Sequence, residues 1–348
     1  MRQKINKIFD SMGNVFLNDK YDLSYVAESR DWVIGQLGRE ITSNLNSLKM
    51  IKSRMTLSSF GLRNKIVHLG SPHIFLKDNG VCHIDKTNKY VLSWFHIVPG
   101  NRRNKNIIEG QKHLSFIHTA CYSTKKELVN LGVKENKIIV IPLGINLSLF
   151  KPSLNKGLDL PKDKIIIGSF QKDGIGWKEG LEPKMVKGPD IFVKVVSELN
   201  KIHPVFVLLV GPSRGYVTKE LGKRGIPYKS IGFLRDFRDI VQYYQALDLY
   251  LITSRIEGGP RAILESWATK VPLVSTKVGM VPDIAENGLN ALLTEVEDVG
   301  EIISKAKMII ENKNLRESLI NNGFEAVQNY SLEKTTKRFF NEIYSKLL

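Results

Sequence analysis

The sequence predicts an α/β protein of two domains, each a parallel β-sheet with crossover helices. The chain has 348 residues, 42% of them hydrophobic, which is enough to bury two ordinary cores. Short apolar runs alternate with helical stretches, a pattern typical of parallel sheets whose strands are joined by helices. Residues 147–164 are rich in Lys, Asn, Pro and Gly, and this change in composition predicts a domain boundary.

The first half contains four apolar runs bounded by turn-forming residues. The strands predicted from them are residues 65–69, 90–95, 118–122 and 137–142. A helix is predicted from Ser123 to Gly132, where Ser123 and Thr124 followed by Glu127 suggest a capping box. Residues 36–58 carry apolar residues at steps of three and four beside basic ones, which predicts an amphipathic basic helix. Such a helix fits either a membrane surface or its own sheet.

The second half contains further apolar runs and helical patterns. The predicted strands are residues 165–170, 205–211, 247–253 and 271–276, and the predicted helices are 191–199, 236–246 and much of the chain from residue 299 onward. The run at 205–211 is continuously apolar, which is typical of a central parallel strand buried on both faces.

The chain is strongly basic, with a net charge of +16 and a pI near 9.6. About two-thirds of the excess falls in the first 150 residues. A basic face fits nucleic acid, anionic lipid or an acidic substrate, and a lysine-rich proteome gives the same composition. No basic recognition helix, zinc spacing or basic sheet with interleaved aromatics is present, so we expect no nucleic-acid partner.

The cysteine content and the beginning of the chain bear on location. Cys82 and Cys121 lie far apart without metal-ligand spacing, which favours a reducing compartment. The first residues lack the apolar core of a signal peptide, and no later run is long enough to span a bilayer. We therefore expect a cytoplasmic protein, at most peripheral at the inner face of the membrane.

Residues 247–276 form the most informative stretch, a predicted strand, loop, helix and strand. Gly258 and Gly259 permit a sharp turn, and Pro260 fits the first turn of a helix. The free amides and positive end of that helix would form an anion site, for which phosphate is the usual occupant. Glu257 and Glu265 lie about 10 Å apart by helical rise, which suits sugar hydroxyls on either side of a diphosphate. Taken singly, the turn fits a plain structural turn and Glu265 a solvated helix residue.

A second glycine-proline helix start follows Lys187. Gly188 and Pro189 would leave backbone donors free, and Lys187 adds a full positive charge beside them. The preceding loop, residues 173–186, contains three glycines and Trp177. Its pattern fits a mobile flap over a bound diphosphate and an inert surface insertion equally well.

His96 follows the predicted strand at 90–95. Ligands in open α/β sheets bind beyond the carboxyl ends of strands, and a histidine there can orient a sugar hydroxyl. A helix-capping or surface histidine is the alternative. His68, His73 and His83 lie on separate segments without the spacing of a metal site.

In combination and in order, these motifs resemble the retaining GT-B glycosyltransferases of family 4, over roughly residues 118–348. The resemblance is carried by Glu257-x7-Glu265 with its glycines, by Lys187-Gly188, by the hinge at 142–152 and by the turn at 279–284. It implies the GT-B fold, two Rossmann-like doubly wound domains facing each other across a cleft. Residues 1–146 with the crossover helix 332–348 would bind the acceptor, and 147–331 the nucleotide sugar.

The resemblance also implies the roles of individual residues. Glu257 would face the donor sugar, Glu265 the ribose and Lys187 the diphosphate, with His96 beside the reacting sugar, so that His96, Glu257 and Lys187 are the catalytic candidates. The implied donor-binding residues are Gln171, Lys172, Lys187, Gly188, Phe233, Leu234, Glu257, Gly258, Gly259, Pro260, Arg261, Ala262 and Glu265. Gln171 stands where the family has arginine, and either Lys172 or Arg261 would supply the missing charge.

The activity implied is transfer of a hexose from a nucleotide-diphosphate sugar to a saccharide or lipid-linked saccharide, with retention, as in cell-surface polysaccharide assembly. The chain contains no Asp-x-Asp, so we expect neither a metal nor another cofactor, and the lysines would stabilise the departing diphosphate. No enzyme nucleophile is identifiable, which favours front-face attack with the leaving phosphate as base. A GT-B sugar-nucleotide epimerase, a catalytically inactive member of the family and a basic nucleic-acid or membrane-binding protein are the alternatives.

Overall fold

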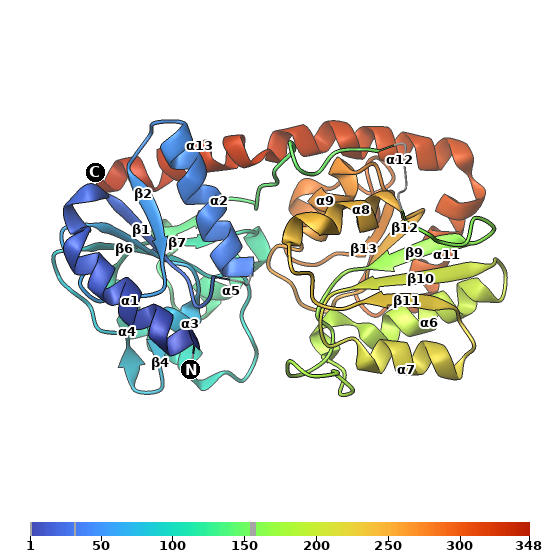
Figure 1. The fold of residues 1–348 in the computed structure, drawn as a ribbon, viewed down its shortest axis with the longest axis horizontal. Helices are drawn as coiled ribbons and strands as arrows, with labels where there is room; N and C mark the ends of the chain where they lie inside the picture. Colours follow the sequence, from blue (N-terminus) through green and yellow to red (C-terminus); the bar gives the residue numbers. More distant parts are fainter. Residues whose placement is uncertain (1, 31–32, 154–157) are drawn as a thin grey trace. The chain divides into compact units, whose positions relative to one another are not determined.

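The computed structural model describes residues 2–30, 33–153 and 158–348. The chain divides into two compact units (Figure 1). Unit 1 comprises Met1–Gly144 and Leu332–Leu348, and unit 2 comprises Ile145–Ser331. The domain limits predicted from the sequence, 1–146 and 147–331, differ from this division by two residues.

Unit 1 contains a six-stranded parallel sheet with the strand order β2-β1-β3-β6-β7-β8. Its strands are β1 (Leu23–Val26), β2 (Ser53–Thr56), β3 (Ile66–Leu69), β6 (Lys89–Ser93), β7 (Leu114–Thr119) and β8 (Ile138–Val140). A short antiparallel hairpin pairs β4 (Leu76–Lys77) with β5 (Gly80–Val81). All four residues of β1 and of β3 are buried, as expected of parallel strands covered on both faces.

The helices of unit 1 surround this sheet. They are α1 (Arg2–Phe16), α2 (Val33–Ser47), α3 (Pro72–Phe75), α4 (Ile107–Gly110), α5 (Tyr122–Asn130) and α13 (Leu332–Glu342). Leu37, Ile41 and Leu45 of α2 are at most 2% exposed, and α2 packs against β2 and α13. The apolar side of this helix therefore covers its own sheet, which decides between the two alternatives that the sequence left open.

Three predicted boundaries in unit 1 were wrong. The helix predicted over 36–58 ends at Ser47, because Lys49 takes a left-handed conformation and the chain then enters β2. The strand predicted at 118–122 begins at Leu114 and ends at Thr119. Cys121, not Ser123, precedes α5, and Thr124 donates to the carbonyl oxygen of Phe95 at 2.8 Å instead of capping the helix.

Unit 2 contains a second six-stranded parallel sheet with the order β11-β10-β9-β12-β13-β14. Its strands are β9 (Ile165–Ser169), β10 (Val205–Val210), β11 (Tyr228–Ile231), β12 (Leu249–Ile252), β13 (Leu273–Thr276) and β14 (Leu292–Thr294). The order reverses between β9 and β12. This reversal is the topological switch point at which open α/β sheets bind ligands.

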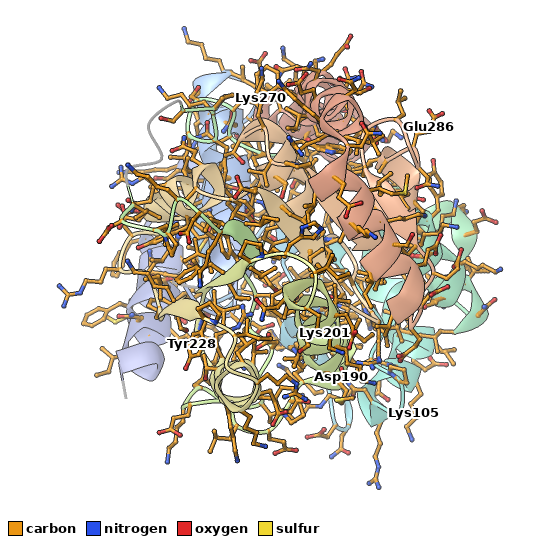
Figure 2. All side chains as sticks on the ribbon, turned by 90° about the vertical axis from the view of Figure 1, so that its right-hand side faces the viewer. Lys105, Asp190, Lys201, Tyr228, Lys270 and Glu286 are labelled. Atoms are coloured by element: carbon orange, nitrogen blue, oxygen red, sulfur yellow. The ribbon has the colours of Figure 1, made fainter. Side chains whose placement is uncertain are left out.

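The helices of unit 2 cover both faces of its sheet. They are α6 (Pro189–Asn200), α7 (Gly215–Lys223), α8 (Ile240–Gln245), α9 (Ala262–Ala268), α10 (Val281–Ile284), α11 (Val299–Glu311) and α12 (Lys313–Ala326). In Figure 1, α6 and α7 lie on one face and α8 and α9 on the other. Figure 2 labels Asp190 at the beginning of α6 and Tyr228 on the outer strand β11.

Within the residues that the structure describes, no helix is both long and apolar enough to cross a bilayer.

A buried polar chain crosses the sheet of unit 1. His68 contacts Tyr344 through Nδ1 (2.7 Å) and Ser93 through Nε2 (2.8 Å), and Ser93 also contacts His118 Nδ1 (2.8 Å). His118 Nε2 donates to the carbonyl oxygen of Ile141 at 2.9 Å. Both histidines are fully buried, and burial lowers the pKa of His118 from 6.5 to about 4 and the pKa of His68 well below 6.5. Both imidazoles are therefore neutral at pH 7.

This chain predicts a specific loss of stability in mild acid. Between pH 6.5 and 4 the unfolded chain binds protons at both histidines while the folded chain does not, so the free energy of unfolding falls as the pH falls. The expected slope is up to about 1.4 kcal/mol per pH unit for each histidine. Urea unfolding measured across this range should show a shallower slope for His118→Gln than for the wild type. His83→Gln, at an exposed position, should keep the wild-type slope; equal slopes in all three proteins would contradict the assignment.

Candidate functional site

The candidate site lies in unit 2, where the chain leaves β9 and β12 at the switch point. Gln171 follows β9, and the segment 253–257 follows β12. The segment that begins α6, at Lys187 and Gly188, lies against the end of β12. Three loops from distant parts of the sequence therefore meet at the carboxyl edge of the sheet, where the strand order reverses.

Four side chains from these loops form one hydrogen-bonded cluster. Lys187 Nζ lies 2.5 Å from Glu257 Oε1. Ser254 Oγ donates to the same carboxylate oxygen at 3.0 Å and lies 3.5 Å from Gln171 Oε1. Gln171 Nε2 donates to the carbonyl oxygen of Lys187 at 3.0 Å. The structure thus brings together three residues that the sequence indicated, and it adds Ser254, which a single serine after a strand could not have signalled.

Gly188 fixes the distance between the loops. Its φ is +63°, and a Cβ atom at this position would lie 1.9 Å from the carbonyl oxygen of Thr253. Thr253 Oγ1 in turn donates to the carbonyl oxygen of Gly188 at 2.9 Å. The N–H of Gly188 donates to Met185, so it is not one of the free donors expected there. Only glycine permits this approach, which places Lys187 beside Glu257.

Arg255 links the same loops by hydrogen bonds and ion pairs. Its guanidinium donates to both carboxylate oxygens of Asp190 at 2.8 Å and to the carbonyl oxygen of Met185 at 2.7 Å, and it also pairs with Glu297. These hydrogen bonds lower the pKa of Asp190 and raise that of Arg255. Neither residue was indicated by the sequence, because one arginine and one acid 65 positions apart carry no local signal.

Lys172, Lys184, Lys187 and Glu257 form a group of interacting charges in this part of the site. Burial lowers the pKa of Lys184, and the charges of Lys187 and Lys172 lower it further while Glu257 opposes them. Lys172 Nζ donates to the carbonyl oxygen of Gly174 at 3.2 Å and lies 4.8 Å from the centre of the Trp177 ring. The three lysines outnumber Glu257, and the neighbouring acid Asp173 is paired with Arg214, so the site has a surplus of positive charge that favours an anion. Lys184 was not among the predicted residues.

The loop 173–186 is anchored at its base. Asp173 and Arg214 form a buried ion pair at 3.1 Å, with 1% and 3% of their side chains exposed, and burial raises the pKa of Asp173 despite its partner. Arg214 also donates to the carbonyl oxygens of Ser169 and Gln171, each at 2.7 Å. Gly180 lies against Ser213, whose carbonyl oxygen would be 2.4 Å from an added Cβ. The tip remains exposed at Trp177.

Glu265 is not a solvated helix residue. The helix α9 begins at Ala262 and is preceded by Arg261, so Glu265 lies within its first turn. It is 6% exposed, and Tyr244 donates to its Oε2 at 2.7 Å. Burial and this carboxylate raise the pKa of Tyr244 well above its usual value. Tyr244 also stacks on Tyr250, with ring centres 5.2 Å apart, so the carboxylate is held in a defined orientation.

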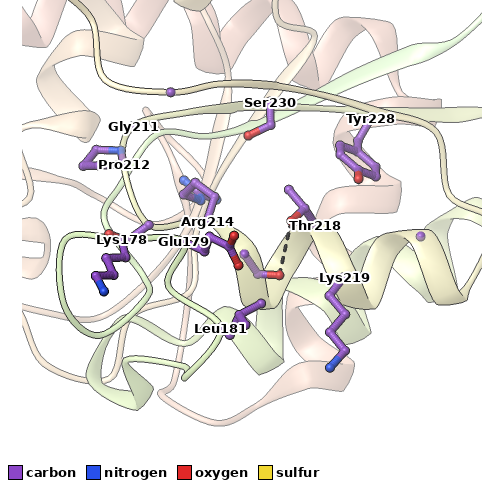
Figure 3. Close-up of a pocket in the computed structure, with 14 residues that line it drawn as sticks. Lys178, Glu179, Leu181, Gly211, Pro212, Arg214, Thr218, Lys219, Tyr228 and Ser230 are labelled. Carbon is purple, nitrogen blue, oxygen red and sulfur yellow. Dashed lines mark hydrogen bonds between the residues drawn. The ribbon is translucent and has the colours of Figure 1, made fainter.

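A hollow of about 670 Å³ opens beside this cluster, between the end of β10, the first turns of α7 and the strand β11. Figure 3 shows Ser230 and Tyr228 on one side of it and Thr218 and Lys219 of α7 on the other. Arg214 and Gly211 connect it to the backbone of Gln171. Gly232 lines the hollow, and the next residue, Phe233, is 64% exposed. Phe233 and Leu234 follow the end of β11 at Ile231.

His96 lies in unit 1, just beyond the carboxyl end of β6, and its side chain is exposed. Trp94 Nε1 donates to its carbonyl oxygen at 3.0 Å. The position agrees with the sequence interpretation, and the role of the imidazole stays a prediction.

A comparison with known protein families gives a match for the part of the chain that contains most of the cluster. Residues 181–326 match the family "Glycosyl transferases group 1". These residues form a glycosyl transferases group 1 domain. It contains Lys187, Ser254, Glu257 and Glu265, whereas Gln171 and Lys172 precede its first matched residue.

Relatives of this glycosyltransferase domain include two bacterial enzymes. The chain is 30% identical over 217 residues to the UDP-Gal:alpha-D-GlcNAc-diphosphoundecaprenol alpha-1,3-galactosyltransferase of Escherichia coli, covering 57% of this chain and 53% of that protein. It is 27% identical over 277 residues to the N,N'-diacetylbacillosaminyl-diphospho-undecaprenol alpha-1,3-N-acetylgalactosaminyltransferase of Campylobacter jejuni, covering 74% and 69%. The matches span about half the length of the first curated relatives.

The fold of the whole chain is similar to that of solved structures. Anabaena HepE in complex with UDP and glucose superposes with a TM-score of 0.72 at 16% identity, covering 93% of this chain and 100% of HepE. At this identity the likeness establishes the fold. The predicted fold class, α/β with two Rossmann-like doubly wound domains of the GT-B type, is confirmed.

The close contact between Gly188 and Thr253 predicts that adding a single methyl group at Gly188 strongly lowers the free energy of unfolding. In Gly188→Ala the new Cβ meets the Thr253 carbonyl at a position that also has a left-handed φ, and we expect a loss of at least about 2 kcal/mol in unfolding free energy. Gly176→Ala is the matched control: its φ is +76° and nothing lies within 4 Å of the added Cβ, so only the backbone cost of about 1 kcal/mol remains. Urea unfolding compares the two; equal losses would show that the approach is not tight.

Proposed function

We propose that this chain is a retaining glycosyltransferase of family 4 that transfers a hexose from a nucleotide-diphosphate sugar to a saccharide or lipid-linked saccharide acceptor. The observation that carries the proposal is the Lys187–Glu257 pair, held with Ser254 and Gln171 at the switch point of a glycosyl transferases group 1 domain. A cation next to a carboxylate at this edge suits a ligand with a diphosphate next to a polyol.

The lysines are assigned to the diphosphate. The charges of Lys187 and Lys172 act on Lys184, so the three lysines form one positively charged group. Fixed cations near a leaving group stabilise the charge that develops on it. Gln171, which replaces the arginine expected at this position, is neutral and donates to the backbone of Lys187 instead. Lys172 and Lys184 would therefore supply the charge that the arginine provides elsewhere, and we propose that the reaction needs no metal.

The two acids are assigned to the two ends of the donor. Glu257 would hold hydroxyls of the hexose and balance the positive charge on an oxocarbenium-like centre, with Ser254 fixing one of its oxygens. Glu265, oriented by Tyr244, would hold the ribose. The base would lie along Phe233 and Leu234, next to the hollow at Gly232. The acceptor hydroxyl would then attack on the front face, with the leaving phosphate as base.

The acceptor is assigned to unit 1. Its share of the net charge of +16 is about four-fifths, which suits the diphosphate of a lipid-linked saccharide. The Escherichia coli and Campylobacter jejuni relatives are both named for diphosphoundecaprenol substrates. We propose that His96 lies near the reacting sugar, and that the protein works in cell-surface polysaccharide assembly from the cytoplasmic side of the membrane.

The proposal predicts separable effects of the two partners in the pair. Lys187→Ala removes a charged hydrogen-bond partner of the diphosphate. The dissociation constant of UDP, or of the nucleotide that the thermal-shift screen identifies, should therefore rise by about 10- to 100-fold. Glu257→Gln should leave nucleotide binding unchanged or tighter, because Lys187 loses its competing partner, while transfer of the hexose falls by about 100-fold or more. Calorimetric titration and a transfer assay measure the two effects.

Lys194→Ala is the control for removal of a positive charge, since Lys194 lies on α6 with its side chain exposed. Thermal-shift measurements with UDP-, GDP- and ADP-sugars identify the nucleotide first. The donor is also incubated with the protein without acceptor and monitored by NMR. Conversion of the donor into its epimer would favour the epimerase instead. Failure of every nucleotide sugar to stabilise the wild type more than Glu265→Ala would refute the donor site.

A further inference from the structure

The helix α1 packs on the rest of unit 1 through its polar side. Asn14 is fully buried and donates to the carbonyl oxygens of Ser58 and Phe60, each at 2.8 Å. Asp10 accepts from the N–H of Leu57 at 2.7 Å and pairs with Arg30 at 2.6 Å. A surface helix of a globular protein ordinarily turns its apolar stripe toward the core, and α1 does the reverse.

The opposite side of α1 carries an exposed apolar stripe. Its exposed fractions run from 44% at Ile5 to 80% at Phe16. The residues of this α1 stripe are Ile5, Ile8, Phe9, Met12, Val15 and Phe16. Their spacing of three and four places them along one line of the helix. Phe60, in the segment under α1, adds another ring that is 67% exposed.

An apolar stripe of this size marks an interaction surface rather than scattered exposure. The charges around it indicate the partner. The sequence of α1 contains three cations, Arg2, Lys4 and Lys7, and only one acid, Asp10, which is turned to the unit and paired with Arg30. Among the charged residues just after α1, Asp19, Lys20 and Asp22 are all exposed. The charge of the whole unit decides the sign, because unit 1 holds about four-fifths of the net charge of +16.

We infer that α1 docks unit 1 on an anionic lipid bilayer, with the α1 stripe in the acyl region and the net positive charge of unit 1 attracted to the headgroups. An amphipathic helix with an apolar line and basic surroundings binds in the plane of such an interface. Its 15 residues form a helix about 22 Å long, which lies along the unit and presents its whole apolar line at once. A second copy of the chain fits less well, because two strongly cationic units would face each other.

The assignment is specific to α1. Leu37, Ile41 and Leu45 of α2, the segment whose sequence suggested a membrane helix, are buried in unit 1. Docking would hold the proposed lipid-linked acceptor and the enzyme at one surface, but it rests on the exposed stripe and not on the transferase activity.

Sedimentation with lipid vesicles tests the inference. The full chain should bind vesicles of phosphatidylcholine containing about 30% phosphatidylglycerol, and bind phosphatidylcholine alone more weakly. Ile8→Asp should reduce binding to the anionic vesicles by at least about tenfold. Ile202→Asp is the matched control, because Ile202 of unit 2 is 52% exposed and Ile8 60%, and it should bind like the wild type. Ile8→Gln, which favours the helix and adds no charge, should show the same direction of change.

Circular dichroism and the thermal shift with nucleotide should be the same for all these variants, because α1 is not part of the donor site. The inference is overturned if the wild type binds neither vesicle, if Ile8→Asp binds as well as Ile202→Asp, or if light scattering shows a dimer that Ile8→Asp separates. Lost vesicle binding with intact nucleotide binding leaves the proposed function standing. Intact vesicle binding without any nucleotide response refutes the proposed function alone.

Discussion

The close approach of Gly188 to Thr253 is the constraint on which the candidate site depends. It brings the beginning of α6 within contact of the end of β12, although the two lie 65 residues apart in the chain. A β-carbon would fill this space, so the backbone itself, not a side chain, sets the spacing. Arg255 reinforces the same junction by binding Asp190 and the carbonyl oxygen of Met185. Lys187 and Glu257 meet because these two loops meet.

The Lys187–Glu257 ion pair contributes little to the stability of the fold, and its position allows Lys187 to exchange Glu257 for a bound anion. Both side chains are largely shielded from water, with 21% and 12% exposed, and a shielded ion pair gains little net free energy because both charges lose hydration. Under the proposed function, a diphosphate offers Lys187 a second anion while Ser254 keeps its hydrogen bond to Glu257. The carboxylate is then available to sugar hydroxyls. The backbone contact at Gly188 holds the geometry of the site, and the exchange of partners at Lys187 costs little because the pair itself gains little.

The sequence was informative where local pattern and tertiary structure coincide. The run at 205–211 was predicted to be a central strand, since a continuous apolar segment of that length between turns is typical of a strand covered on both faces, and it forms β10. The resemblance of their motifs to those of family 4 was what placed Glu257 and Lys187 at one site, and the structure brings the two side chains to 2.5 Å at the carboxyl edge of the sheet. Ser254, Arg255 and Lys184 could not be placed there, since a single polar residue in a loop acquires its meaning from a partner far away in the chain. The burial of Glu265 likewise depends on Tyr244, which belongs to another helix.

Amphipathic pattern alone does not state which side of a helix faces the protein, and α1 and α2 show this in one unit. Both have an apolar line at helical spacing, and their buried residues are opposite in character: Leu37 and Ile41 for α2, Asn14 for α1. The difference arises from what lies beneath each helix. Under α2 is the apolar surface of the sheet, whereas under α1 the chain at 54–60 presents carbonyl oxygens, an N–H group and Arg54, which need polar partners once they are covered. Asn14 and Asp10 meet that need, and helical geometry then forces the apolar residues to the other side. The exposed stripe is thus the consequence of a satisfied polar contact, and the free energy that an ordinary helix gains by burying its apolar face remains available to a bilayer.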